Sequence, residues 1–248
     1  VMARRCVSYE REGGMHKAFA INGSPQTEQG DTAMILGPFM EGLVDAGCEV
    51  ELFYPSRLDV KPCTCGEMYC WFRRPGECCI KDDMQLVYPK LKGADLLILA
   101  TPVYVPLPGA MQNVLNRLCP LVKPLLERRE GRTRARFHED VRIQRIVLVS
   151  TGGWWEKENF ATVVRIAEEF AENASVPFAG SVLRPHAFMM KRGGVLTEEG
   201  RAVVEALREA GRELIEEGAL RTETLDAISR PLISEEELRQ RYNRLLDT

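Results

Sequence analysis

Short apolar runs alternate with amphipathic stretches along most of this chain. Five runs have the length and apolar content of buried strands, at 17–22, 50–54, 95–100, 144–150 and 178–183. Apolar residues at helical spacing predict helices that follow 23–31 and 82–83, and further helices over 109–118, 160–173 and 198–217. Regular alternation of strand and helix predicts an α/β fold with a parallel, doubly wound sheet and right-handed crossovers.

The first predicted helix shows the amphipathic pattern clearly. Asp31 or Thr32 can cap its start, and Gly47 fits its end. Pro38 lies inside the helix, where its missing N–H and its ring predict a kink. The apolar face repeats with a period of 3.6 residues and consists of Ile35, Leu36, Phe39, Met40, Leu43 and Val44.

The pattern also divides the chain. Residues 17–220 contain all the predicted strands, and we expect them to form one domain with a sizeable core. Residues 1–16 precede the first strand and are expected to be a loose extension. Residues 221–248 are polar and partly helical, with Ser234 as the expected N-cap of the last helix. Such a tail is expected to pack on a neighbouring surface or subunit.

Composition narrows the class of protein without identifying it. Of 248 residues, 45% are hydrophobic and 28% are charged, and the formal net charge is −3. This balance gives no electrostatic reason to expect nucleic acid or an acidic membrane as a partner. No apolar run approaches the roughly 20 residues that span a bilayer, and residues 1–15 lack the apolar segment of a secretory signal. We therefore expect a cytoplasmic protein, in which clustered cysteines stay reduced and favour metal or redox roles.

Three loops follow predicted strands and would meet outside their carboxyl ends, where doubly wound sheets bind ligands. The first, 22–33 (NGSPQTEQGDTA), offers the hydroxyls of Ser24, Thr27 and Thr32 and backbone N–H groups at a helix start. Those groups suit a terminal phosphate, although an ordinary polar turn looks partly similar. The loop matches neither the dinucleotide fingerprint nor the Walker loop, because G-x-G-x-x-G and Gly-Lys-Ser/Thr are absent.

The second and third loops offer apolar and aromatic surface. Loop 101–110 (TPVYVPLPGA) is stiffened by three prolines, and its Tyr104 and Val105 suit the face of an aromatic ring system. A proline-rich helix entry without a ligand is the alternative. Loop 150–160 (STGGWWEKENF) contains two glycines that permit close backbone approach and two tryptophans that could cover a ring. Packing of these tryptophans on the core or on a second subunit is the alternative.

These motifs together resemble one family. GSP…GDTA after the first strand, the cysteine stretch that ends in CIKDDM, and ATPVYVPLPGAMQNVLNRL are similar, in that order, to the NADPH-dependent FMN reductase-like branch of the flavodoxin-like proteins. That branch includes the iron–sulfur flavoproteins. The resemblance implies a flavodoxin-like three-layer α/β/α sandwich with a five-stranded parallel sheet in the order 2-1-3-4-5. It also implies a homodimer or homotetramer, in which NADPH or NADH reduces FMN and a quinone, flavin or other small acceptor takes the electrons.

By this resemblance, the first loop would hold the FMN phosphate, the second would line the isoalloxazine ring, and the third would close over its other edge. The cofactor-binding residues would be Ser24, Gln26, Thr27, Gly30, Asp31, Thr32, Pro102, Val103, Tyr104, Val105, Thr151, Gly152, Gly153 and Trp154. Gln26 stands where the family commonly has arginine and Asp31 where it has asparagine, which should weaken phosphate binding. No catalytic side chain is assigned, because FMN would carry the reaction.

The stretch 61–84 (KPCTCGEMYCWFRRPGECCIKDDM) contains five of the eight cysteines. In the iron–sulfur flavoproteins that the chain resembles, four cysteines at compact spacing hold a four-iron four-sulfur cluster. Here the four candidate ligands have a shifted spacing and are Cys63, Cys65, Cys70 and Cys78. Three interpretations stay open: an iron–sulfur cluster, a zinc site, or free and redox-active thiols. The matching alternative functions are an iron–sulfur electron carrier and a thiol-based redox or metal sensor.

Residues outside these motifs are expected to be structural. Cys48 and Cys119 look like ordinary small buried residues. His186 follows the fifth strand and could approach the three loops, but a structural role is favoured. Trp71 and Phe72 add aromatic area that favours burial between subunits.

Overall fold

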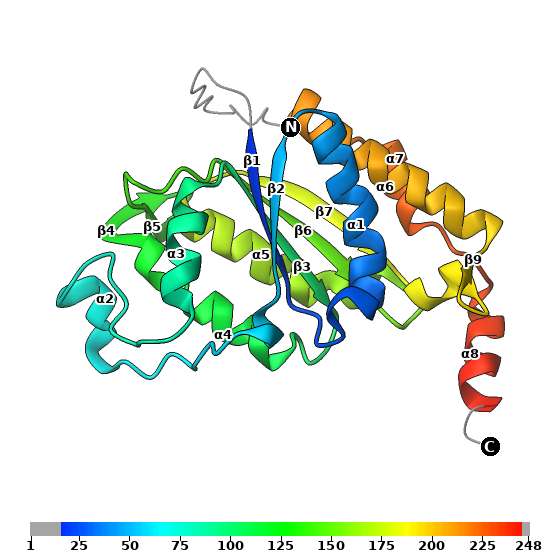
Figure 1. Cartoon of the computed structure of the whole chain (residues 1–248), viewed down its shortest axis with the longest axis horizontal. Helices are drawn as coiled ribbons and strands as arrows, with labels where there is room; N and C mark the ends of the chain where they lie inside the picture. Colours follow the sequence, from blue (N-terminus) through cyan, green and yellow to red (C-terminus); the bar gives the residue numbers. More distant parts are fainter. Residues whose placement is uncertain (1–15, 245–248) are drawn as a thin grey trace.

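The computed structural model describes residues 16–244, and its centre is a five-stranded parallel sheet (Figure 1). Nearly all of the predicted 1–16 extension lies outside the described residues. In spatial order the strands are β2 (Glu49–Phe53), β1 (Lys17–Asn22), β3 (Leu96–Pro102), β6 (Arg145–Thr151) and β7 (Phe178–Arg184). Each coincides with a predicted run to within two residues. This confirms the predicted flavodoxin-like order 2-1-3-4-5.

Helices cover both faces of the sheet, as its apolar strands require. Along β1 the side chains alternate: Ala18 and Ala20 pack toward α1 and α6, whereas Phe19 and Ile21 pack toward α3, α4 and α5. Among the described residues, no helix has the length and apolar character needed to cross a bilayer. The helices that pack on the two faces of the sheet include α1 (Asp31–Asp45), α3 (Met84–Gly93), α4 (Gly109–Asn116), α5 (Ala161–Ala174) and α6 (Glu198–Glu216).

Helix α1 continues through Pro38 as one element, and its start differs from the prediction. Gly30 is the N-cap residue, Asp31 is the first helical residue, and no side chain caps the first turn. The predicted cap by Asp31 or Thr32 is therefore wrong. The Thr32 hydroxyl instead lies 2.9 Å from the Thr151 hydroxyl, which takes it away from the helix end.

Two other predicted helix ends are confirmed. Gly47 has φ +88° and donates its N–H to the Val44 carbonyl at 2.9 Å, as expected of a glycine that terminates a helix. In the C-terminal tail, the Ser234 hydroxyl accepts a hydrogen bond from the Glu237 N–H at 3.2 Å. The tail contains the helices α7 (Thr222–Ser229) and α8 (Glu235–Arg244).

Helices α1 and α6 approach each other closely at two glycines. A Cβ atom at Gly42 would lie 1.9 Å from the Arg208 carbonyl oxygen, and one at Gly211 would lie 2.2 Å from the Phe39 carbonyl oxygen. Both obstacles are backbone atoms, so Gly42→Ala should push the helices apart and lower the free energy of unfolding by about 1–3 kcal/mol. Gly37→Ala in the same helix meets nothing within 4 Å and is the control. Urea unfolding measures both variants, and equal stability would contradict the close packing.

Residues 122–137 form an antiparallel hairpin that the sequence pattern did not predict. Strands β4 (Val122–Arg129) and β5 (Arg132–Phe137) are joined by Glu130 and Gly131, both at positive φ. Such two-residue turns match the natural twist of a hairpin. The hairpin is rich in charged residues, so it lacks the apolar alternation by which a half-buried strand is recognised. Shorter elements are α2 (Tyr69–Phe72), β8 (Lys191–Arg192) and β9 (Val195–Leu196).

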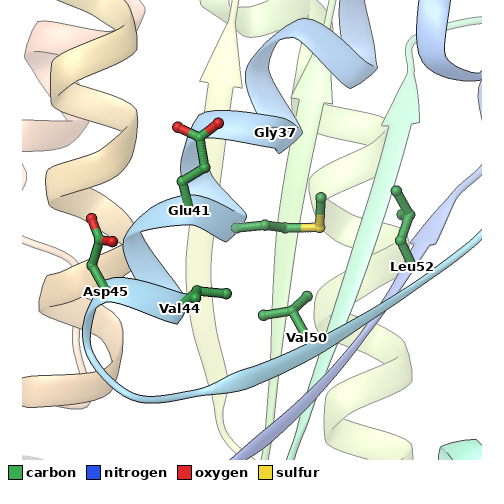
Figure 2. A pocket seen from close by; sticks show the side chains of 7 residues that line it. Gly37, Glu41, Val44, Asp45, Val50 and Leu52 are labelled. Carbon is green, nitrogen blue, oxygen red and sulfur yellow. The ribbon is translucent and has the colours of Figure 1, made fainter.

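A shallow groove lies between α1 and the edge strand β2 (Figure 2). Its two acidic residues are already paired, because Arg208 donates to Glu41 at 2.8 Å and Arg212 lies 3.5 Å from Asp45. None of the residues that line the groove comes from the three loops. The lining residues are Gly37, Met40, Glu41, Val44, Asp45, Val50 and Leu52.

Candidate functional site

The three loops meet at the carboxyl edge of the sheet, where hydrogen bonds join them. The buried hydroxyls of Thr32 and Thr151, 119 positions apart in sequence, lie 2.9 Å from each other and link the start of α1 to the third loop. The Val103 N–H donates to the Thr151 carbonyl at 2.8 Å and links the second loop to the third. The Ser150 hydroxyl donates to the Thr101 carbonyl at 2.7 Å. The fold thus combines the three predicted loops in one surface.

The first loop presents N–H groups and hydroxyls around the start of α1. Ser24 is buried; its N–H donates to the Asn22 side chain at 3.0 Å, and its hydroxyl accepts from the Gln26 N–H at 3.3 Å. Within residues 16–244, the N–H groups of Asp31 and Thr32 have no acceptor, and the buried Asn22 Nδ2 atom has no partner. Unpaired N–H groups at the positive end of a helix dipole suit an anion.

Positive charge reaches the first loop from other parts of the chain. Arg57, just after β2, donates to the Thr27 hydroxyl at 3.4 Å and pairs with the neighbouring glutamate. Burial raises the pKa of Asp31, an effect that the charge of Lys191 opposes. Arg57 therefore stands near the first loop, in which Gln26 replaces the arginine that is common in the family that the sequence resembles.

The second loop exposes apolar side chains beside the first. Val105 is 99% exposed and Tyr104 is 53% exposed, whereas Val103 packs against the core. The Tyr104 N–H donates to the Pro106 carbonyl at 2.9 Å, which closes a tight turn. The two exposed side chains form an apolar platform at the end of β3, which suits the face of a planar ring.

The two tryptophans of the third loop lie in different environments. Trp155 donates its indole N–H to the Ile233 carbonyl at 3.0 Å and is thereby tied to the C-terminal tail. Trp154 remains 71% exposed, so its ring is available to cover a ligand. A Cβ atom at Gly152 would lie 2.9 Å from the Phe160 ring. The close packing of this ring therefore leaves room only for glycine at position 152.

A buried ion pair fixes both ends of the cysteine stretch. The Arg117 guanidinium, just after α4, donates to the two Asp82 carboxylate oxygens at 2.6 and 2.9 Å and to the Lys61 carbonyl at 2.9 Å. Asp82 also accepts from the Lys61 N–H at 2.9 Å. The Arg117 and Asp82 side chains are 1% and 0% exposed. Burial alone raises the pKa of Asp82, but hydrogen bonds from Arg117 and from backbone N–H groups outweigh burial and lower it.

The thiols of the stretch differ in burial and affect one another's pKa values. The Sγ atoms of Cys63 and Cys65 lie 3.7 Å apart near the surface. Cys70 is buried, and the thiol of Cys119 is the main cause that raises the pKa of the Cys70 thiol, an influence that no sequence spacing could indicate. Among residues 16–244, no group of three or more histidine, cysteine or acidic side chains is arranged to hold a metal ion. The predicted ligands Cys63, Cys65, Cys70 and Cys78 therefore do not form a metal-binding set in this arrangement.

His186 and Arg184 anchor the C-terminal tail from the end of β7. Both side chains are fully buried. The His186 Nε2 atom accepts from the Leu232 N–H at 3.1 Å and lies 3.1 Å from a guanidinium nitrogen of Arg184. Arg184 also donates to the Pro185 and Ile228 carbonyls. His186 thus contacts the tail, and sequence offered no signal for this contact beyond its place after a strand.

Comparison with known proteins gives a family match. The family described as NADPH-dependent FMN reductase matches residues 16–155, a little more than half of the chain. An iron–sulfur flavoprotein of Methanocaldococcus jannaschii is 31% identical over 109 residues, which are 44% of this chain and 53% of that protein. An iron–sulfur flavoprotein of Methanosarcina thermophila is 36% identical over 90 residues, which are 36% and 44% of the two chains. The chain thus spans about half the length of the curated relatives it matches.

Solved structures show the same fold at low sequence identity. An NAD(P)H:quinone oxidoreductase from Methanothermobacter marburgensis is similar with a TM-score of 0.56 and 18% identity, over 82% of this chain and 98% of that one. An FMN-dependent NADH-azoreductase from Bacillus anthracis is similar with a TM-score of 0.54 and 12% identity, over 82% and 100% of the two chains. Both likenesses support the flavodoxin-like fold. Together with the match over residues 16–155, they lead to one conclusion: this chain belongs to the NADPH-dependent FMN reductase family.

Proposed function

We propose that this chain binds FMN across the three loops and acts as an NAD(P)H-dependent oxidoreductase. The observation that carries the proposal is that hydrogen bonds join the three loops. The joined loops present unpaired N–H groups at the start of α1 together with the exposed side chains of Tyr104, Val105 and Trp154. A phosphate suits the first feature and a planar ring suits the second. The family match supports the same cofactor.

Each loop would hold a different part of FMN. The N–H groups of Asp31 and Thr32 and the hydroxyls of Ser24 and Thr27 would donate to the phosphate. The side chains of loop 101–110 would support one face of the ring, and loop 150–160 would close over its edge. Bound FMN supplies hydride and electron transfer, and the chain's residues orient it and exclude water.

FMN binding is the first test. Purified protein should be yellow, and its apoprotein should bind FMN in a fluorescence titration. Thr32→Val should weaken FMN binding by about five- to tenfold, because it removes a hydroxyl at the start of α1 and leaves the Thr151 hydroxyl without this partner. Thr133→Val makes the same change on an exposed residue of the hairpin and should not affect binding. A colourless protein whose apoprotein binds no FMN would refute the proposal.

Electron transfer is the second test. Oxidation of NADPH and NADH should proceed with a quinone, a free flavin or another small acceptor in excess, and the comparison of rates identifies the preferred nucleotide and acceptor. A protein that binds FMN but oxidises neither nucleotide would instead be an electron carrier.

An iron–sulfur electron carrier is the second candidate function, because the curated relatives are named iron–sulfur flavoproteins. Four thiols for a cluster exist at Cys63, Cys65, Cys70 and Cys78. Their arrangement does not fit a cluster, since no metal-binding group forms among the described residues. We therefore derive no electron step through a cluster. About four iron atoms per chain in protein purified without oxygen would establish this candidate, and iron-free protein that keeps FMN would reject it.

Assembly into a homodimer or homotetramer is part of the proposal. Phe72 is 69% exposed in α2, and Leu126 is 60% exposed in the nearby strand β4. Apolar side chains of this kind favour burial against another subunit. Light scattering that shows a monomer would reject the assembly.

A further inference from the structure

The C-terminal segment, defined as residues 221–244, is held against the edge of the sheet by buried contacts. Arg184 and His186, both fully buried, bind the Ile228 carbonyl and the Leu232 N–H. Farther along, the Leu238 side chain is 4% exposed. Buried polar contacts of this kind specify one position for a segment, because leaving any of these groups unpaired would be costly. These buried contacts therefore fix the position of helix α8, which lies beyond β9 in Figure 1.

Near the end of α8, Tyr242 reaches the third loop. Its hydroxyl donates to the Gly153 carbonyl at 3.3 Å, and a Cβ atom at Gly153 would lie 3.0 Å from that hydroxyl. Its ring packs edge-to-face on Phe188, with ring centroids 5.9 Å apart. The ring is therefore held from two sides, although 45% of the residue is exposed.

The charge at the start of α1 also acts on Tyr242. Burial raises the pKa of its hydroxyl, and the charge of Asp31 raises it further. Asp31 begins α1, where the phosphate would bind, and Gly153 belongs to the loop that would close over the ring. Tyr242 thus contacts the third loop, and its hydroxyl is influenced by the charge at the start of α1.

We propose that Tyr242 is a residue of the FMN site, contributed by the C-terminal segment, and that it covers the bound flavin beside the third loop. This inference rests on the proposed function. The match to the FMN reductase family ends at residue 155, so Tyr242 lies in a part of the chain that the match does not cover. A tyrosine suits this position because its ring offers apolar contact while its hydroxyl keeps a hydrogen bond at the edge.

The test is titration of the apoprotein with FMN, followed by iodide quenching of the bound flavin's fluorescence. Tyr242→Ala should raise the dissociation constant about tenfold and increase the iodide quenching, because it removes both the ring and the hydrogen bond. Tyr242→Phe should fall between wild type and Tyr242→Ala, because the ring remains. Arg239→Ala is the control in the same helix, since the ion partners of Arg239 are Glu235 and Glu236 of α8 itself.

The outcomes separate this inference from the proposed function. Wild-type protein that binds FMN while Tyr242→Ala matches it in affinity and quenching would overturn the role of Tyr242 alone. Wild-type protein that binds no FMN would overturn both. If Tyr242→Ala lowers the thermal stability of the apoprotein, the more conservative Tyr242→Phe decides, and wild-type affinity and quenching in that variant would also overturn the role.

Discussion

Asp82→Ala should lower the free energy of unfolding by about 3–5 kcal/mol, the largest effect that the structure predicts for a single substitution. The change leaves the Arg117 guanidinium buried without its carboxylate, and two N–H groups, of Lys61 and Met84, lose their acceptor. A buried charge without its partner is far more costly than the pair is stabilising. Urea unfolding at neutral pH, with an unchanged m-value, measures the effect.

Two further variants sharpen this prediction. The double variant Asp82→Leu with Arg117→Met should be less destabilised than the sum of its single changes, because no unpaired charge remains buried. Arg73→Ala removes an exposed ion pair with Glu67 in the same stretch and should change stability little. If Asp82→Ala is as mild as Arg73→Ala, the pair does not fix the ends of the cysteine stretch.

Acidification should destabilise the protein through His186, by about 3 kcal/mol when the pH has fallen to 4. Burial, reinforced by the charge of Arg184, lowers the pKa of His186 from 6.5 to about 4. Between these pH values the unfolded chain binds a proton that the folded chain does not, so this contribution to stability is complete above pH 6.5 and is lost as the pH falls toward 4. Protonation would also convert Nε2, which accepts from the Leu232 N–H, into a donor that faces a cation.

The matched variant is His186→Gln, whose amide oxygen can replace Nε2 as an acceptor but does not titrate. Unfolding by urea at several pH values compares it with wild type. The wild-type free energy of unfolding should fall more steeply than that of His186→Gln between pH 6.5 and 4, although the carboxylates contribute equally to both curves. Parallel curves would contradict the buried, neutral histidine.

The strands and the three loops were predictable because their signals are local. A run such as 95–100 is apolar because its strand is covered on both faces, and that requirement acts on consecutive residues. The loops follow from topology, since parallel strands present their carboxyl ends at one edge. The cap of α1 was mispredicted because Thr32, although suited to capping by composition, forms a hydrogen bond with the distant Thr151.

Contacts between distant segments were the part that the sequence did not reveal. Arg117 looked like any charged residue at the end of a helix, and its burial with Asp82 depends on how the cysteine stretch folds back. Cys119 shows no spacing relative to Cys70 that would indicate its influence on the pKa of the Cys70 thiol. The hairpin 122–137 was not predicted because its many charged side chains do not alternate with apolar ones as in a half-buried strand.

By itself, the sequence determined the order of strands and helices and the doubly wound α/β class, because apolar periodicity is a property of neighbouring residues. Its three motifs also carried the resemblance that implied the flavodoxin-like fold and the family. Only the tertiary structure decided which side chains surround the candidate site and how the thiols are grouped. It tied Trp155 to the C-terminal tail while leaving Trp154 exposed, and it brought Tyr242 to Gly153. The physical reason is that these contacts join residues far apart in the chain, and only packing of the whole core fixes their distances.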